Sequence, residues 1–237
     1  MNPIWAAAGA VVGLLAGAAI RGTVFRLSVP SGEPQRIACP RCSAPAHHRL
    51  VLRCGRCRSS LGTPLALELS TAAVLALVLS RFAGQADVLA FAFFGVLGVA
   101  LAAIDIAVQR LPDALTLPAY PILITLLTGA AIASHDFAAL LRALLGGLCL
   151  AGLYLLLALI RPGQLGGGDI KVAGVAGLAL GWLGWPVLIV GAALGFVLSA
   201  IVSVALLVAR RVTLHSGISF GPFLLGGALL AMLAAGR

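Results

Sequence analysis

Residues 161–171 read Arg-Pro-Gly-Gln-Leu-Gly-Gly-Gly-Asp-Ile-Lys and form a short polar break between two apolar runs. Three glycines stand directly before Asp169, and the apolar run 172–183 follows it. Because a glycine backbone bends freely and Asp favours helix starts, the break predicts a turn into a buried helix with Asp169 as its N-cap. Ionisable groups at membrane-spanning runs are rare and usually functional, so Asp169 is the first candidate site residue.

The composition around this break is typical of a membrane protein. Of the 237 residues, 61% are hydrophobic and only 10% are charged, which is far from the composition of soluble domains. A chain of this length accommodates about eight spans of ~20 residues and one longer loop. The net charge of +9 is explained by loop arginines that set membrane orientation, so we expect no nucleic-acid partner.

The apolar runs predict an all-α, polytopic membrane bundle of about eight transmembrane helices. The sixth run is short and rich in glycine and alanine, which favours a central helix pressed against its neighbours. Gly146 and Gly147 in the fifth run, and Gly191 and Gly195 in the seventh, allow similar close contacts. The predicted spans are 3–21, 64–82, 86–104, 116–134, 137–160, 170–183, 185–209 and 218–235.

The basic residues predict the orientation of the bundle. If residue 1 lies outside, three basic residues, Arg81, Arg142 and Arg237, fall in outside segments and the other thirteen inside. The positive-inside rule therefore places the N-terminus outside and both Asp105 and Asp169 at the cytoplasmic face. The thirteen are Arg21, Arg26, Arg36, Arg41, Arg49, Arg53, Arg56, Arg58, Arg110, Arg161, Lys171, Arg210 and Arg211.

Three of the seven acidic residues lie at span ends on this one side: Asp105, Asp113 and Asp169. Two carboxyl groups at one membrane face are what an aspartyl protease needs, because one acts as acid while the other acts as base. Each residue also has a structural interpretation, with Asp113 and Asp169 as helix caps and Asp105 as an interfacial charge. The glycines before Asp169 favour a functional role, because they let a peptide backbone approach the carboxylate.

The loop 27–63 is the only sizeable polar segment, and it contains Cys39-Pro-Arg-Cys42 and Cys54-Gly-Arg-Cys57. Two such pairs at this spacing present four thiolates to one Zn²⁺ and predict a small, cytoplasmic, zinc-ribbon-like loop. Disulfides or free thiols are the alternative, which a cytoplasmic location disfavours. His47 and His48 are predicted to be solvated, since four sulfurs complete a structural zinc site.

These motifs, in this order, resemble the type IV prepilin peptidases, which are membrane aspartyl proteases of the GxGD type. The resemblance covers nearly the whole chain. It is carried by residues 13–27 as a degenerate first helix, the paired C-x-x-C, Glu68 at the acidic position of the second span, Asp105 ahead of Leu111-Pro112-Asp113, Gly166-Gly-Gly-Asp169 followed by x-Lys171, and Ser219-Phe-Gly-Pro222.

The resemblance implies an enzyme of the bacterial inner membrane that removes the short basic leader of prepilin or pseudopilin precursors. Cleavage would occur at the cytoplasmic face, after a glycine and before an apolar helix. The catalytic pair of that family corresponds here to Asp105 and Asp169. Supporting site residues are Gly166, Gly168, Lys171 and Asp113.

Many members of that family also methylate the new N-terminus, using S-adenosylmethionine. Where their first helix usually has Ser and Asn, this chain has Ala18 and Arg21. The resemblance therefore implies protease activity, because both protease motifs are intact, and it leaves methylation open. It also implies two parts of the chain: an N-terminal region, 1–85, with two helices and the cysteine loop, and a peptidase core, 86–237.

Two other functions fit parts of the sequence. A proton- or ion-coupled transporter would use acids at helices broken by glycine, but it predicts an inverted repeat, and the sequence contains no convincing one. A non-catalytic protein would use the basic cysteine loop to dock on anionic lipid or on a partner, with the acids serving as caps.

Overall fold

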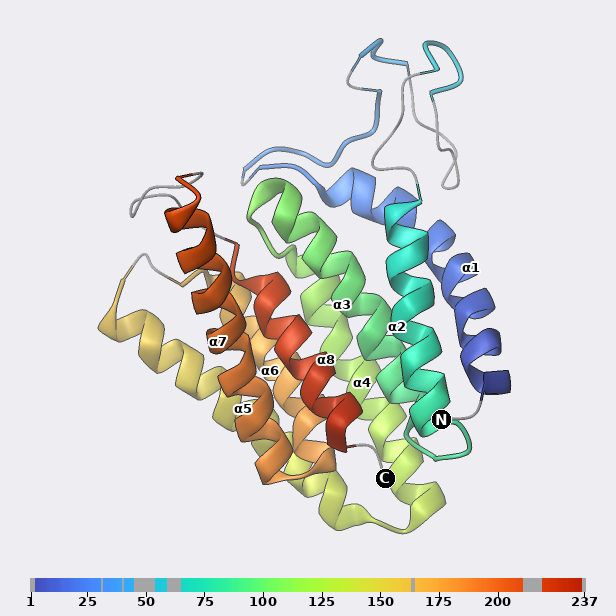
Figure 1. Ribbon diagram of the computed structural model, residues 1–237, viewed down its shortest axis with the longest axis vertical. Coiled ribbons are helices and arrows are strands. Elements are labelled where there is room, and N and C mark those ends of the chain that lie inside the picture. The colour runs from blue at the N-terminus through green and yellow to red at the C-terminus, as the bar shows by residue number, and fades with distance from the viewer. Residues whose placement is uncertain are drawn as a thin grey trace.

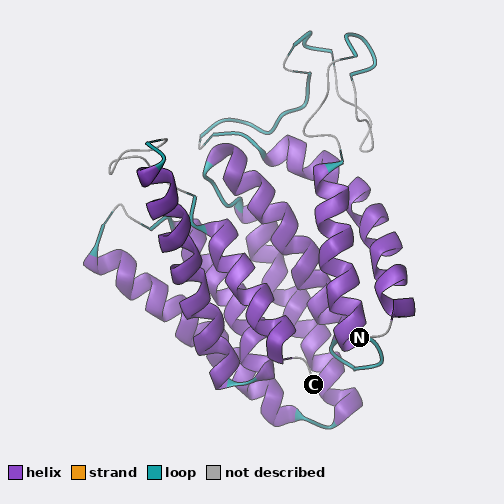
Figure 2. Ribbon diagram, in the orientation of Figure 1, coloured by secondary structure: helices purple, strands orange, loops and turns teal. Residues whose placement is uncertain are grey.

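The structure is a computed structural model that describes residues 3–30, 32–39, 41–44, 54–58, 65–162, 165–210 and 219–235. His47, His48, Arg49, Arg53, Arg211 and Arg237 lie outside these residues. The described residues form an all-α bundle (Figures 1 and 2) of eight helices: α1 (Pro3–Leu27), α2 (Ala66–Phe82), α3 (Val88–Val108), α4 (Asp113–Ser134), α5 (Phe137–Ile160), α6 (Gly167–Leu183), α7 (Trp185–Val208) and α8 (Gly221–Ala235).

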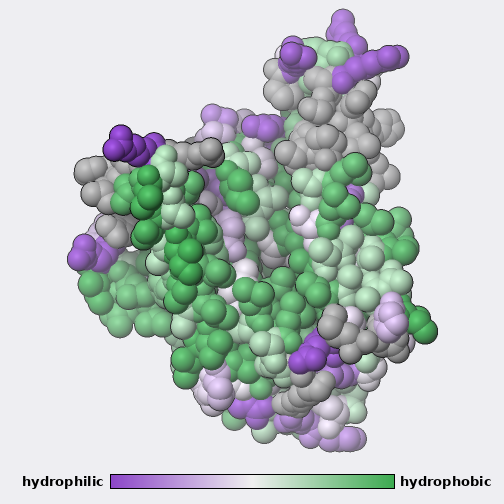
Figure 3. Space-filling model, in the orientation of Figure 1, coloured by the Kyte–Doolittle hydropathy of each residue, from purple (hydrophilic) through white to green (hydrophobic). Residues whose placement is uncertain are grey.

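Each predicted span coincides with one helix, so the predicted fold class is confirmed. The helices α1, α3, α4, α5 and α7 have 21 to 25 residues and are apolar enough to cross a membrane. Their outward side chains are large and apolar; Leu148, Leu159 and Val208, for example, are 72%, 69% and 78% exposed. Figure 3 shows such hydrophobic residues over much of one face of the bundle, where a bilayer would cover them.

Helix α6 is the core of the bundle, as predicted for the sixth span. All of residues 172–182 are buried, and the helix contacts α3, α4, α5, α7 and α8. The predicted glycine contacts are also present. A Cβ added to Gly146 would lie 2.7 Å from the Gly177 carbonyl oxygen, and one added to Gly195 would lie 3.1 Å from the Leu224 Cα. Helices α5 and α6, and likewise α7 and α8, therefore pack backbone against backbone.

Helices α1 and α2 form a tightly packed pair. Gly9, Gly13 and Gly17 recur every fourth residue on the buried face of α1, and added Cβ atoms there would strike α2. One turn further on, the Arg21 guanidinium forms a buried ion pair with the Glu68 carboxylate. This pair explains why α1 continues to Leu27, past the end predicted at residue 21, because the charge of Arg21 is neutralised within the helix pair.

The bundle has two distinct ends (Figure 1). The described parts of the connections α1–α2, α3–α4, α5–α6 and α7–α8 lie toward the upper end in that view, and the start of α1 and the end of α8 lie toward the lower end. Hydrogen bonds join helices at the lower end, where the Trp182 indole N–H donates to Asp87 at 2.8 Å and Arg81 donates to the Leu233 carbonyl at 3.1 Å.

Candidate active site

Asp105 lies in the last turn of α3 and is only 4% exposed. The sequence placed it just beyond the span, whereas α3 continues to Val108. Its Oδ2 atom accepts hydrogen bonds from the Ser219 hydroxyl and from the Gly221 backbone N–H, the latter at 3.0 Å. The segment leading into α8 therefore fixes the position of this carboxylate.

Asp169 is half-buried in the first turn of α6. The prediction that it is the N-cap is wrong by three residues, because Gly166 occupies the N-cap position. Instead, the Asp169 Oδ2 reaches back and accepts the Gly166 N–H at 3.1 Å. This interaction satisfies one of the backbone donors that a helix start leaves without a partner and aims the carboxylate along the turn.

Both carboxylates line one open cavity of about 270 Å³ at the upper end of the bundle. The cavity is bounded by Gln109–Leu111 and Asp113 from the α3–α4 connection, and by Gly166–Gly168 from the start of α6. Two carboxyl groups in one solvent-accessible site can share a proton, which general acid–base chemistry on a peptide bond requires.

The three glycines before Asp169 have different surroundings. A Cβ on Gly168 would lie 2.8 Å from the Leu111 Cβ, and one on Gly166 would lie 3.3 Å from the Asp169 Oδ2. A Cβ on Gly167 would meet nothing within 4 Å. Gly168 therefore allows the α3–α4 connection to pack against the start of α6, whereas Gly167 faces open space.

Lys171 and Asp113 join α6 to the start of α4. The Lys171 ammonium lies 2.6 Å from the Asp113 carboxylate, and both side chains are substantially exposed. Lys171 also contributes its carbonyl, which accepts the Tyr120 hydroxyl at 2.7 Å. These contacts fix the start of α6 relative to α4, and both helices line the cavity.

Because exposed ion pairs contribute little, Asp113→Asn is expected to reduce the rate of peptide cleavage by no more than about tenfold. Lys171→Met should have a similar effect. The double variant should be no worse than either single one, since both changes remove the same contact. Turnover measurements on the three variants test this. A loss at Asp113 as large as that at Asp105 would give Asp113 a direct catalytic role.

A cluster of three aromatic rings includes a residue of the segment that leads into α8. The ring of Tyr154, fully buried on α5, lies 5.5 Å from that of Phe196 on α7 and 5.9 Å from that of Phe220, measured between centroids. Phe220 stands between Ser219 and Gly221, the two donors to Asp105. The cluster thus anchors the segment that orients Asp105.

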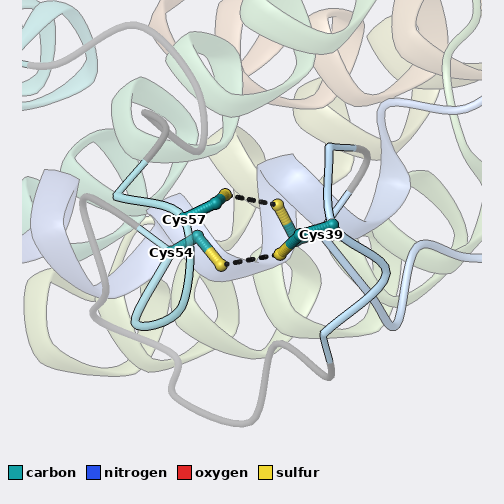
Figure 4. A group of neighbouring side chains, drawn as sticks. Cys39, Cys54 and Cys57 are labelled. Atoms are coloured by element: carbon teal, nitrogen blue, oxygen red, sulfur yellow. Dashed lines mark hydrogen bonds between the residues drawn. The ribbon is translucent and has the colours of Figure 1, made fainter.

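The four cysteines of the first loop converge, as predicted. Their sulfur atoms all lie within 4.8 Å of one another, with 3.7 Å between Cys39 and Cys57 and 3.4 Å between Cys42 and Cys54. A disulfide requires about 2.05 Å, whereas a tetrahedral site with Zn–S bonds of about 2.3 Å separates its sulfurs by roughly 3.8 Å. The two C-x-x-C turns face each other (Figure 4), and their donor set fits one Zn²⁺ ion.

The sequence did not predict the contacts that Ser219 and Gly221 make with Asp105. The F-G-P motif marked this segment, but nothing in its pattern pointed to a carboxylate more than a hundred residues away. A second contact was also missed: Arg110, which lines the cavity, donates to the Pro30 carbonyl at 3.1 Å. This hydrogen bond joins the α3–α4 connection to the chain that leads into the cysteine loop.

Comparison with known proteins gives consistent matches. The model of the type IV leader peptidase family matches residues 91–208. Three curated proteins named prepilin leader peptidase/N-methyltransferase are similar to this chain. The protein of Burkholderia pseudomallei (strain K96243) is 32% identical, over 86% of this chain and 67% of its own length. That of Pseudomonas aeruginosa (strain PAO1) is 32% identical over 83% and 70%, and that of Aeromonas salmonicida is 31% identical over 88% and 73%. No solved structure matches at comparable significance.

The similarity extends beyond the part matched by the family model. An alignment over 86% of the chain is longer than residues 91–237, so it must include residues of the N-terminal helices or the cysteine loop. The family model itself spans both Asp105 and Asp169 and ends before Ser219.

Proposed function

The chain belongs to the type IV leader peptidase family, and we propose that it is an aspartyl endopeptidase of the bacterial inner membrane that removes the basic leader from prepilin-like precursors. The observation that carries this proposal is the shared cavity, in which Asp105 and Asp169 meet at one end of a membrane bundle. Membership of the family does not favour the transporter or the non-catalytic docking protein.

In the proposed mechanism the two carboxyl groups hold one proton between them, since like charges in one partly buried site are costly to ionise together. The ionised group takes a proton from water as the water attacks the scissile carbonyl. The protonated group donates its proton to the developing oxyanion or to the leaving amine. No covalent acyl-enzyme forms, and the titration belongs to the pair rather than to either residue.

Incubation of the purified protein with a prepilin-type peptide tests the function directly. The peptide carries a basic leader, a glycine and the apolar segment that follows it, and mass spectrometry locates the cut. We expect one cut, after the glycine. A peptide left intact by folded protein would contradict the proposal.

The same products answer the question of methylation, which the names of the relatives include. S-Adenosylmethionine would add one methyl group to the new N-terminus, and its mass is visible in the product. In this chain the buried acid of the first two helices, Glu68, is engaged by Arg21. It therefore offers no unpaired carboxylate to a cationic cosubstrate.

For the cysteine cluster we propose one structural Zn²⁺ held by Cys39, Cys42, Cys54 and Cys57. As an ion with no redox chemistry, it would hold the loop folded, because a closed four-sulfur site leaves no position for substrate. None of the four cysteines lines the catalytic cavity, so loss of the metal should affect stability more than the chemical step.

Metal analysis should find about one zinc ion per chain in protein purified under reducing conditions. Cys39→Ser and Cys54→Ser should lose the zinc and lower the unfolding temperature, whereas Cys149→Ser, an exposed cysteine on α5, should change neither. Quantitative disulfides in cells would contradict the zinc site.

We further propose that the N-terminus lies outside and that the cavity and the cysteine loop face the cytoplasm. Positive-inside charge supports this orientation. So does the arrangement of the bundle, since the described part of the cysteine loop, the end of α3 with Asp105 and the start of α6 with Asp169 share one end, whereas the start of α1 and the end of α8 share the other. Arginines of the cytoplasmic loops would contact anionic lipid headgroups.

Cysteine labelling in a background without the native cysteines tests this orientation. Ser43 and Ser134 are both exposed and lie at opposite ends of the bundle. A cysteine at position 43 should react only from the cytoplasmic side, and one at position 134 only from outside. The reverse pattern would put the catalytic cavity on the wrong face for a newly made precursor.

We also propose a functional boundary near residue 85. The N-terminal region, 1–85, would contain the metal-binding loop on its helix pair, and residues 86–237 would be the peptidase core. The extensive contacts between α1 and α2, and the start of the family match at residue 91, support this division.

A further inference from the structure

A second concavity, which we name the lateral groove, opens between α2, α3 and α8. It encloses about 150 Å³ and is lined almost wholly by apolar atoms. Gly95, Gly98 and Ala102 of α3 form its floor, and its sides are formed by Val74 of α2 and by Leu225 and Leu229 of α8. Figure 3 views the face of the molecule formed by these three helices, which is largely hydrophobic.

The lateral groove leads to the catalytic site. On α3 its floor residues recur at intervals of three and four, and Asp105 is the next residue on that face of the helix. On α8 the lining residues run back to Pro222, which follows Gly221, a donor to Asp105. Asp105 lines the catalytic cavity, so on α3 that cavity begins one turn beyond Ala102, the last groove residue of this helix.

The floor is more open at Gly98 than at Gly95, where an added Cβ would lie 2.7 Å from the Val74 Cγ1. A Cβ added to Gly98 would still lie 3.7 Å from the nearest atom, Leu225 Cδ2. Between Gly95 and Ala102 the floor is about 10 Å long, or roughly two helical turns. Beyond Leu229 the groove is bridged, because Arg81 of α2 donates to the Leu233 carbonyl of α8.

We infer that the lateral groove receives the first two turns of the substrate's apolar helix, immediately after the scissile bond. This inference rests on the proposed function. A substrate cut just before an apolar helix must bring that helix to the acids, and the lateral groove is an apolar surface whose α3 lining ends one helical turn from Asp105. Small floor residues allow the close backbone contact by which helices associate in lipid, where apolar burial alone gives no attraction.

A lipid acyl chain is the competing occupant. It would fill apolar space equally well, but nothing in it requires a path that ends at a carboxylate. A substrate helix in the groove would bring its scissile bond to Asp105, whereas a lipid chain would not. A substitution in the groove and cross-linking from the substrate helix distinguish the two occupants.

The first test fills the floor of the groove with Gly98→Leu. With a substrate that contains its complete apolar helix, this variant should raise KM by about tenfold or more, because the added side chain occupies the position of the substrate backbone. The kcat should stay near that of the wild type. The matched control is Gly152→Leu, the same change at an exposed glycine of α5 with no atom within 4 Å, and it should leave both constants unchanged.

The second test uses the unaltered enzyme, so it does not depend on the folding of a variant. A photoreactive benzoylphenylalanine placed in the first two turns of the substrate helix should cross-link to residues 95–102 and 222–229. Cross-links to α5 or α7, cross-links to lipid alone, or an unchanged KM for folded Gly98→Leu would overturn the inference. Failure of the wild-type enzyme to cut would count against the proposed function, and the cross-links would still decide the occupant of the groove.

Discussion

Asp105→Asn and Asp169→Asn are each expected to reduce prepilin cleavage by about a thousandfold or more while the protein stays folded in the membrane. Asparagine keeps a carbonyl oxygen in place. At position 105 that oxygen can still accept from Ser219 and Gly221, and at position 169 it can still accept the Gly166 N–H. The change therefore removes the exchangeable proton and the charge and leaves the local hydrogen bonds intact.

Asp136→Asn is the matched control for this pair. Asp136 caps α5 at the opposite end of the bundle, where its side chain accepts the Ala139 N–H at 2.8 Å, and asparagine caps a helix about as well. Cleavage by this variant should equal that of the wild type. Activity retained in either catalytic variant would remove that residue from the mechanism.

Gly168→Ala is the second substitution with a large expected effect. Its methyl group would lie 2.8 Å from the Leu111 Cβ, which is buried between the start of α6 and the α3–α4 connection. The two segments must separate, and they carry the walls of the cavity around Asp169. Displacing a catalytic group by about 1 Å can cost a hundredfold in rate, so we expect kcat to fall by about that factor.

Gly167→Ala is the control for this substitution. It separates the clash with Leu111 from a general loss of backbone flexibility at the start of α6. Its methyl group meets nothing within 4 Å, so kcat should stay within about twofold of the wild type. Gly167 lines the cavity, and a rise in KM alone would indicate that the substrate backbone passes this residue. Equal losses of kcat at positions 167 and 168 would contradict the packing argument.

The helices could be predicted from the sequence because a bilayer imposes a simple rule on length and polarity. The span predicted at 137–160 is matched by α5 at both ends. Errors arose where a charge or a glycine run blurred the boundary. Arg21 was taken as the end of the first span, but a partner on α2 keeps it inside the helix pair. The start of α6 was placed at Asp169, because three successive glycines give no preference among possible caps.

The candidate site could be predicted only in part. Asp105, Asp169 and the cysteine pairs stood out because acids are rare in this chain and because paired C-x-x-C has a regular spacing. The residues that orient Asp105 did not stand out. Ser219 and Gly221 reach it by folding of the whole bundle, and a local pattern contains no information about which helices will be neighbours. The same limit applies to the hydrogen bond between Arg110 and Pro30.

The contact between Asp105 and the start of α8 joins residues that the ribosome adds at well-separated times. Both acids have been synthesised by residue 169, whereas Ser219 and Gly221 follow 50 and 52 residues later in the sequence. A nascent chain with seven inserted helices thus contains the full catalytic pair but lacks the donors that orient one of its members. We therefore expect proteolytic competence to require the eighth helix, so a chain truncated after α7 should retain both acids and yet leave a prepilin peptide uncut.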